Sequence, residues 1–134
     1  MASLGVQLAI IDGDRVLLTM REDFEVWCLP GGGVDPGEVA ADAAIREAQE
    51  ETGLEIELMR CVGLYCHPYP NDDLNNHILL FAARPVGGTL MTTTPETLDA
   101  QFFQRDELPS DIIPWQLPRI DDVFSGVCGR VSTQ

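Results

Sequence analysis

Residues 32–54 read GGVDPGEVAADAAIREAQEETGL, and they carry the clearest structural signal in the chain. Ala, Glu, Gln and Arg dominate from Gly37 to Thr52, and all four are strong helix formers. Pro36 stands just before this segment, and Gly53 follows it at the position where a glycine commonly ends a helix. We therefore predict a helix over residues 37–52.

Three glutamates of this predicted helix share one face. Glu47, Glu50 and Glu51 are spaced i, i+3 and i+4, which brings helical side chains together. Like charges at this spacing repel one another, so a cation among them would relieve the cost. Mg²⁺ takes oxygen ligands and is commonly held by a few carboxylates together with substrate phosphates. The pattern therefore predicts a site for Mg²⁺, or Mn²⁺, and its alternative is a solvated acidic face without a ligand.

The surroundings of the three glutamates fit a helix that lies between a sheet and a ligand. Arg46 adjoins the acidic face and can pair with one of its carboxylates. Glu38 is expected one turn into the helix, where its charge suits the helix N-terminus. The preceding segment Pro30–Gly33, called the glycine loop below, can bring a backbone carbonyl close to a metal. Small residues on the opposite face would allow close packing on a sheet: Ala40, Ala43, Ala44 and Ala48.

The rest of the chain alternates between apolar segments and turn signals. A polar loop is expected over His67–Asn76, a turn over Arg84–Gly88, and a terminal helix over Ile120–Val127. Strands are expected over Leu4–Ile11, Arg15–Met20, Val26–Leu29, Glu55–Cys66, His77–Ala83 and Ala100–Gln104. This order predicts an α/β fold, with a mixed sheet and helices packed on it, in a single domain over residues 1–134.

The composition narrows the range of partners and locations. The 22 acidic residues outnumber the 8 basic residues, giving a formal net charge of -14, and every basic residue is arginine. Such a chain repels polyanions, so binding to nucleic acids or anionic membranes is not expected. The four cysteines lack metal-site spacing and are expected to be reduced and structural, with a disulfide as the minor alternative. No leader or membrane-spanning segment is evident, and a cytoplasmic location is expected.

The motif in residues 32–54 resembles the Nudix signature. That signature is Gly, five residues, Glu, seven residues, Arg-Glu, an aliphatic residue, any residue, Glu-Glu, any residue, Gly and an aliphatic residue. The matching positions are Gly32, Glu38, Arg46, Glu47, Ala48, Glu50, Glu51, Gly53 and Leu54. Upstream, residues 27–32 are similar to the W-x-L-P-G-G entry of this family, and Glu96–Pro109 is similar to a later family stretch. The resemblance implies an α/β/α sandwich around a mixed sheet.

The resemblance also implies a metal-dependent hydrolase that acts on nucleoside diphosphates linked to another moiety. Glu47, Glu50 and Glu51 would bind Mg²⁺ or Mn²⁺, and Gly31 would offer its carbonyl oxygen to the metal. The motif residues would have supporting roles: Arg46 would orient a ligand carboxylate, Glu38 would support the loop and helix geometry, and Gly32 and Gly53 would shape the backbone. The general base stays open between Glu47, Glu50 and Glu96.

The substrate itself is not fixed by the sequence. The candidates are a nucleotide sugar such as ADP-ribose or a dinucleotide, a (d)NTP that is cleaved to monophosphate and pyrophosphate, and a nucleotide that a non-catalytic domain senses. Arg21 can reach a phosphate or can be a surface residue paired with nearby acids, and Tyr65 and Tyr69 can contact a base or ribose. Core packing is the alternative for Tyr65. The sequence gives no oligomeric state, since no heptad repeat or apolar stripe is evident.

Overall fold

The computed structural model describes residues 4–66 and 77–131. Its helices are α1 (Ala40–Thr52) and α2 (Leu117–Phe124), with a short 3₁₀ helix, η1 (Pro114–Gln116), leading into α2. Its strands are β1 (Gly5–Asp12), β2 (Arg15–Arg21), β3 (Trp27–Cys28), β4 (Gly31–Gly33), β5 (Leu54–Cys66), β6 (His77–Gly88), β7 (Thr97–Gln104) and β8 (Arg130–Val131). No helix in the described ranges is long and apolar enough to cross a bilayer.

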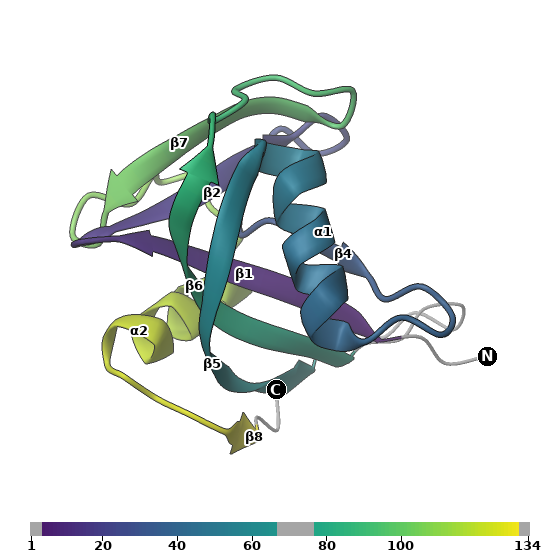
Figure 1. The fold of residues 1–134 in the computed structure, drawn as a ribbon. Helices are drawn as coiled ribbons and strands as arrows, with labels where there is room; N and C mark the ends of the chain where they lie inside the picture. Colours follow the sequence, from purple (N-terminus) through teal and green to yellow (C-terminus); the bar gives the residue numbers. More distant parts are fainter. Residues whose placement is uncertain (1–3, 67–76, 132–134) are drawn as a thin grey trace.

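The strands form one mixed sheet that lies between the two helices. Its strand order is β3-β2-β1-β6-β5-β8, with β4 paired to β1 and β7 paired to β2. The β1–β6 and β5–β8 pairs are parallel, and the other strand pairs are antiparallel. Helix α1 covers one face, and α2 lies on the other side (Figure 1). This is the α/β/α arrangement that the sequence predicted.

Two apolar clusters fill the space between these layers. On the α1 side, Ala43, Ala44 and Ala48 are fully buried against residues of β1, β2, β5 and β6. On the α2 side, Ile120 and Val123 join a second cluster with residues of β1, β2, β5 and β6. The alanines have no side chain beyond Cβ, so α1 approaches the sheet closely with its apolar face. Glu47 and Glu51 of its acidic face lie against the glycine loop instead.

The predicted helix over residues 37–52 starts too early. Helix α1 begins at Ala40, because Gly37 has a φ of 80°, which no residue of a right-handed helix adopts. Glu38 consequently lies before the helix, and the expectation that it sits one turn into the helix is wrong. The predicted end is confirmed: Gly53 caps α1 with a φ of 75°, and its N–H donates to the carbonyl oxygen of Gln49.

Two other predictions need correction, and one falls outside the described residues. Residues 84–88 are not a turn, because β6 continues to Gly88 along the first residues of β5. Helix α2 begins three residues before the predicted Ile120 and accommodates Pro118 in its first turn, where a missing N–H costs nothing. It ends at Phe124 ahead of Gly126, which has a φ of 77°. The predicted loop His67–Asn76 lies outside the described residues.

Candidate active site

Arg46 is the centre of a polar network at the start of the acidic helix face. Its Nε donates to Glu38 Oε2 at 2.8 Å, and its Nη1 donates to Glu47 Oε1 at 2.9 Å and to Glu50 Oε2 at 3.2 Å. Its Nη2 donates to Glu38 Oε1 at 2.9 Å and to the Gly33 carbonyl oxygen at 3.1 Å. One guanidinium thus joins the glycine loop, the segment before α1 and two glutamates of α1.

Glu38 fixes the segment that leads into α1. Its Oε1 accepts the backbone N–H of Asp35 at 3.0 Å, and both of its oxygens face Arg46. The hydrogen bond from Arg46 lowers the pKa of Glu38 to about 2, so this carboxylate stays charged at neutral pH. Glu38 thus links Asp35 to Arg46, and its role in supporting the loop and helix geometry stays a prediction.

Glu51 lies deepest among the three glutamates. Its Oε2 accepts the backbone N–H of Gly31 at 3.2 Å, which links α1 directly to the glycine loop. Burial, with repulsion from Glu47 and Glu96, raises the pKa of Glu51 to about 7. Burial also raises the pKa of Glu47. Burial thus disfavours the charged forms of two neighbouring carboxylates beside the glycine loop.

A glycine is required at one position of the glycine loop, where the loop pairs with β1. A Cβ atom at Gly31 would collide with the Val6 carbonyl oxygen and lie 3.0 Å from Gln7 Cα, both of them backbone atoms. A Cβ atom at Gly32 would lie 2.5 Å from Glu47 Cδ. The pairing with β1 therefore requires a residue without a side chain at Gly31, whereas at Gly32 the nearest atoms belong to the end of the Glu47 side chain, which can move aside.

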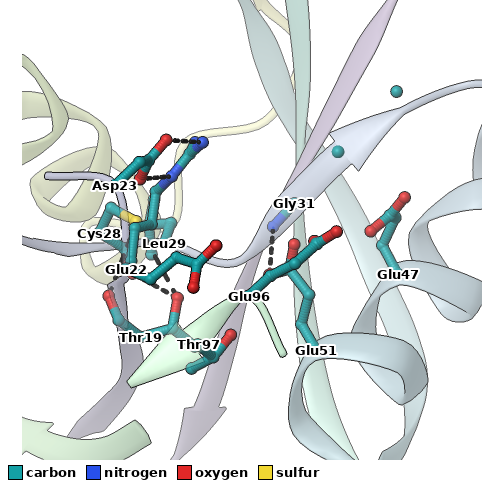
Figure 2. A pocket seen from close by; sticks show the side chains of 13 residues that line it. Thr19, Glu22, Asp23, Cys28, Leu29, Gly31, Glu47, Glu51, Glu96 and Thr97 are labelled. Atoms are coloured by element: carbon teal, nitrogen blue, oxygen red, sulfur yellow. Dashed lines mark hydrogen bonds and ion pairs between the residues drawn. The ribbon is translucent and has the colours of Figure 1, made fainter. Parts of the chain in front are cut away.

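A cavity of about 500 Å³ opens beside the glycine loop (Figure 2). Three glutamates border it next to Gly31: Glu51 and Glu47 come from α1, and Glu96 comes from the segment before β7. The rest of its wall is formed by Thr19, Arg21, Glu22, Asp23, Cys28, Leu29, Gly32, Gly33 and Thr97. A smaller cavity of about 210 Å³ is lined by all four predicted glutamates, Glu47, Glu50, Glu51 and Glu96, with Thr94 and Pro95.

These residues supply the oxygen donors that a hard divalent cation prefers. Within residues 4–66 and 77–131, no three His, Cys, Asp or Glu side chains converge closely enough to enclose an ion. The contacts give the physical reason: Arg46 holds Glu47 and Glu50, and Gly31 holds Glu51. Carboxylate oxygens and a backbone carbonyl oxygen are the kind of donor that Mg²⁺ or Mn²⁺ takes, so the donor set fits either ion by its chemistry.

Of the three residues predicted to contact substrate, one lines the larger cavity, one lies in the core, and one is outside the described residues. Arg21 lines the larger cavity and makes two hydrogen bonds to Asp23, at 3.0 and 2.8 Å. Tyr65 is 4% exposed in the α2-side core, and its hydroxyl donates to Asp122 Oδ2 at 2.8 Å. It does not line either glutamate-lined cavity and matches the core-packing alternative. Tyr69 lies outside the described residues.

Sequence reasoning missed two buried polar residues of the C-terminal segment. Gln116 is 4% exposed and Arg119 is 3% exposed, and both reach the region around the glycine loop. Their spacing of three residues, in phase with the buried Ile120 and Val123, was the available signal. A polar residue on the apolar face of a helix predicts a hydrogen-bond partner in the interior.

Comparison with known proteins identifies the family of this chain. A family model described as the NUDIX domain matches residues 1–123. A putative 8-oxo-dGTP diphosphatase from Bacillus subtilis (strain 168) is 34% identical over 119 residues, which make up 89% of this chain and 77% of that protein. The chain belongs to the Nudix hydrolase family. The family predicted from the motif in residues 32–54 is thereby confirmed.

Other Nudix relatives differ in length and in the activity that their names give. The NAD-capped RNA hydrolase NudC from Pseudomonas putida (strain GB-1) is 34% identical over 99 residues, which are 72% of this chain and only 34% of that protein. An ADP-ribose pyrophosphatase from Streptococcus suis 89-1591 superposes with a TM-score of 0.77 at 26% identity, over 98% of both chains. A UDP-X diphosphatase shares the fold, with a TM-score of 0.80 at 22% identity, over 98% of this chain and 66% of the other.

Proposed function

We propose that this Nudix hydrolase cleaves a phosphoanhydride bond in a nucleoside diphosphate linked to another moiety, such as a nucleotide sugar or a dinucleotide. Mg²⁺ or Mn²⁺ would be held by Glu47, Glu50 and Glu51, with the carbonyl oxygen of Gly31. The observation that carries the proposal is the partly buried Glu51 carboxylate, which contacts the glycine loop and is repelled by Glu47 and Glu96. A bound cation would convert this repulsion into attraction for a phosphorylated substrate.

The proposed reaction is an in-line displacement at phosphorus. A water oxygen attacks, the bond to the bridging oxygen breaks, and the leaving phosphate departs with the electron pair. When bound, the metal would neutralise the charge that builds on the phosphoryl oxygens. Glu96 lines both cavities opposite α1, whereas Arg46 holds Glu47 and Glu50 by ion pairs. We infer that Glu96 accepts the proton of the attacking water and that Arg46 sets the positions of the two glutamates.

A second candidate is the hydrolysis of (d)NTPs, including oxidised ones, to monophosphate and pyrophosphate. It is favoured by the relative from Bacillus subtilis, which spans most of this chain and carries the name putative 8-oxo-dGTP diphosphatase. The first candidate is favoured by the ADP-ribose pyrophosphatase, which matches this chain over nearly its whole length. Arg21 is the one basic residue that lines the larger cavity within residues 4–66 and 77–131, so this lining favours neither substrate class over the other.

A substrate panel with Mg²⁺ should distinguish the two candidates. We expect ADP-ribose or a dinucleotide to give products that release phosphate under alkaline phosphatase, because cleavage exposes terminal phosphates. The (d)NTPs, including 8-oxo-dGTP, would be followed by pyrophosphate release, because alkaline phosphatase attacks these substrates directly. Faster turnover of a (d)NTP would support the second candidate. No hydrolysis of any member of the panel would contradict both.

Arg21 should contribute to substrate binding rather than to the chemical step. It lines the cavity, and Asp23 holds its guanidinium in place through two hydrogen bonds. Replacing Arg21 with Ala should raise KM by about tenfold with little change in kcat, because an interaction equal in ground and transition states affects KM alone. Arg15 is the matched control: it lies on the same strand, pairs with Asp12 at 2.8 Å and does not line the cavity. If Arg15→Ala raises KM equally, Arg21 has no specific role.

A further inference from the structure

The segment before α2 is hydrogen-bonded to the residues that lead into the glycine loop. The Asp111 carbonyl oxygen accepts the N–H of Trp27 at 3.0 Å, and the N–H of Ile113 donates to the Trp27 carbonyl oxygen at 3.0 Å. Ile112 thereby makes a parallel bridge with Trp27. Residues far apart in the sequence are in this way held side by side, immediately before the glycine loop begins.

Gln116 continues this contact with its side chain. Its Oε1 accepts the backbone N–H of Leu29 at 2.7 Å. Gln116 is 4% exposed and Leu29 is 3% exposed, so water does not replace this bond if it is lost. Leu29 stands two residues before Gly31, whose carbonyl is the proposed metal ligand.

Three successive residues are each bonded to a different element. The Leu29 N–H is held by η1 through Gln116, the Pro30 carbonyl oxygen accepts from the N–H of Leu8 in β1 at 2.9 Å, and the Gly31 N–H donates to Glu51 of α1. Arg119 adds a contact at the same place, because its Nη1 donates to Gln7 Oε1 at 3.0 Å and Gln7 is the β1 partner of Gly31. The glycine loop is thus fixed from the α2 side as well as from α1.

We propose that Gln116 is a positioning residue for the metal site, acting through the backbone of Leu29. It holds the start of the glycine loop so that the Gly31 carbonyl and the Glu51 carboxylate stay within reach of one ion. This inference rests on the proposed function, because it assumes that Gly31 and Glu51 bind the metal. Partners of this kind, one step removed from the ligands, typically change metal affinity or activity by about tenfold to a hundredfold.

The test compares Gln116→Met with Gln116→Glu. Methionine has a similar length but offers no good acceptor, whereas glutamate keeps an oxygen that faces the Leu29 N–H. The Mn²⁺ dissociation constant is measured without substrate, and kcat and KM are measured with the best substrate of the panel. We expect Gln116→Met to weaken Mn²⁺ binding about tenfold and to lower kcat at least tenfold with KM nearly unchanged. Gln116→Glu should stay within about threefold of wild type for both.

Arg60→Met is the matched control for a general loosening of α2. Arg60 donates to the carbonyl oxygens of Val123 at 2.6 Å and Val127 at 3.1 Å, so it anchors α2 from β5 without contacting the glycine loop. It should leave the Mn²⁺ dissociation constant within about threefold of wild type. Melting temperatures verify that both variants fold. If Gln116→Met does not fold, Gln116→Asn carries the same expectation, because its shorter side chain withdraws the oxygen from Leu29.

The outcomes separate this inference from the proposed function. Folded Gln116→Met that binds Mn²⁺ like wild type overturns the positioning role, and so does an equal loss in Arg60→Met. A loss confined to one substrate of the panel, with Mn²⁺ affinity intact, also overturns it, because Gln116 would then act on the substrate. Wild-type protein that binds no Mn²⁺ overturns the proposed function, and the positioning role with it.

Discussion

Turnover should fall to background in excess EDTA and return when Mg²⁺ or Mn²⁺ is restored in excess over the chelator. Among the described residues, the acidic lining of the larger cavity is Glu22, Asp23, Glu47, Glu51 and Glu96. Arg21 is the one basic lining residue in the same part of the chain, and it is already paired with Asp23. A phosphorylated substrate would be repelled from such a cavity unless a cation supplied positive charge. Metal removal should lower turnover more than any of the substitutions does, because it removes both the attraction for substrate and the stabilisation of the transition state.

The measurement is the initial rate at a fixed substrate concentration while EDTA and metal are titrated against each other. Full activity in excess EDTA would rule out the proposed mechanism. A thermal shift provides an independent reading, since an ion that binds only the folded protein stabilises it by mass action. At a hundred times its dissociation constant, Mn²⁺ should add about 2.7 kcal/mol to the free energy of unfolding. Ca²⁺ is a useful comparison, because its larger size and higher coordination number make it a poorer fit for a site with few ligands.

The helix with its glutamates was predictable because its signals are local. Residue type, spacing and the terminal Gly53 all lie within the segment that folds, and α1 ends where the sequence predicts. Its start was not predictable from the same signals, because Glu38 is a good helix former but its carboxylate is held outside the helix by Arg46 and Asp35. The φ of 80° at Gly37 and the contact across eight residues from Glu38 to Arg46 thus accompany a helix start that lies later than propensity alone predicts.

The remaining differences arise from pairing between distant segments. Arg84–Gly88 contains Pro and two Gly, which favour a turn, yet this segment is strand because Arg84 pairs with Glu57 and Gly88 pairs with Leu54. Similarly, the pattern around Gln116 cannot reveal that its side chain accepts a bond from Leu29, a residue 87 positions away in the chain. Tertiary contacts of this kind override local preference, and a single sequence contains no direct sign of them.

Replacing Glu51 with Gln should lower kcat by about a hundredfold or more, the scale expected when one key electrostatic group at a reacting centre is lost. The amide keeps the size of the side chain and can still accept the N–H of Gly31, so the change is confined to charge. Glu55 is the control, because it is exposed on β5 and lines neither glutamate-lined cavity. Glu55→Gln should keep nearly full activity. Equal activity in the two variants would end the assignment of α1 as the catalytic element.

Glu51→Gln should also stabilise the metal-free protein, and the pH dependence of its stability shows why. Burial raises the pKa of Glu51 from its ordinary value of 4.5 to about 7 in the folded protein, so between these two pH values the folded state retains a proton that the unfolded state has lost. The free energy of unfolding therefore falls as pH rises from about 4.5 to 7 and stays low above that. In EDTA at pH 8, Glu51→Gln should raise the free energy of unfolding by on the order of 2 kcal/mol, because the amide carries no charge to be buried. Water that still reaches the side chain keeps the gain below the full value of the pKa shift. Melting curves at pH 5 and pH 8 measure this effect. The difference in melting temperature between the two pH values should shrink in Glu51→Gln and persist in Glu55→Gln.

Activity and stability together decide what Glu51→Gln has lost. If the variant is inactive and more stable than wild type, Glu51 serves the function at the expense of the fold. If the variant is inactive and less stable, the substitution has damaged the structure.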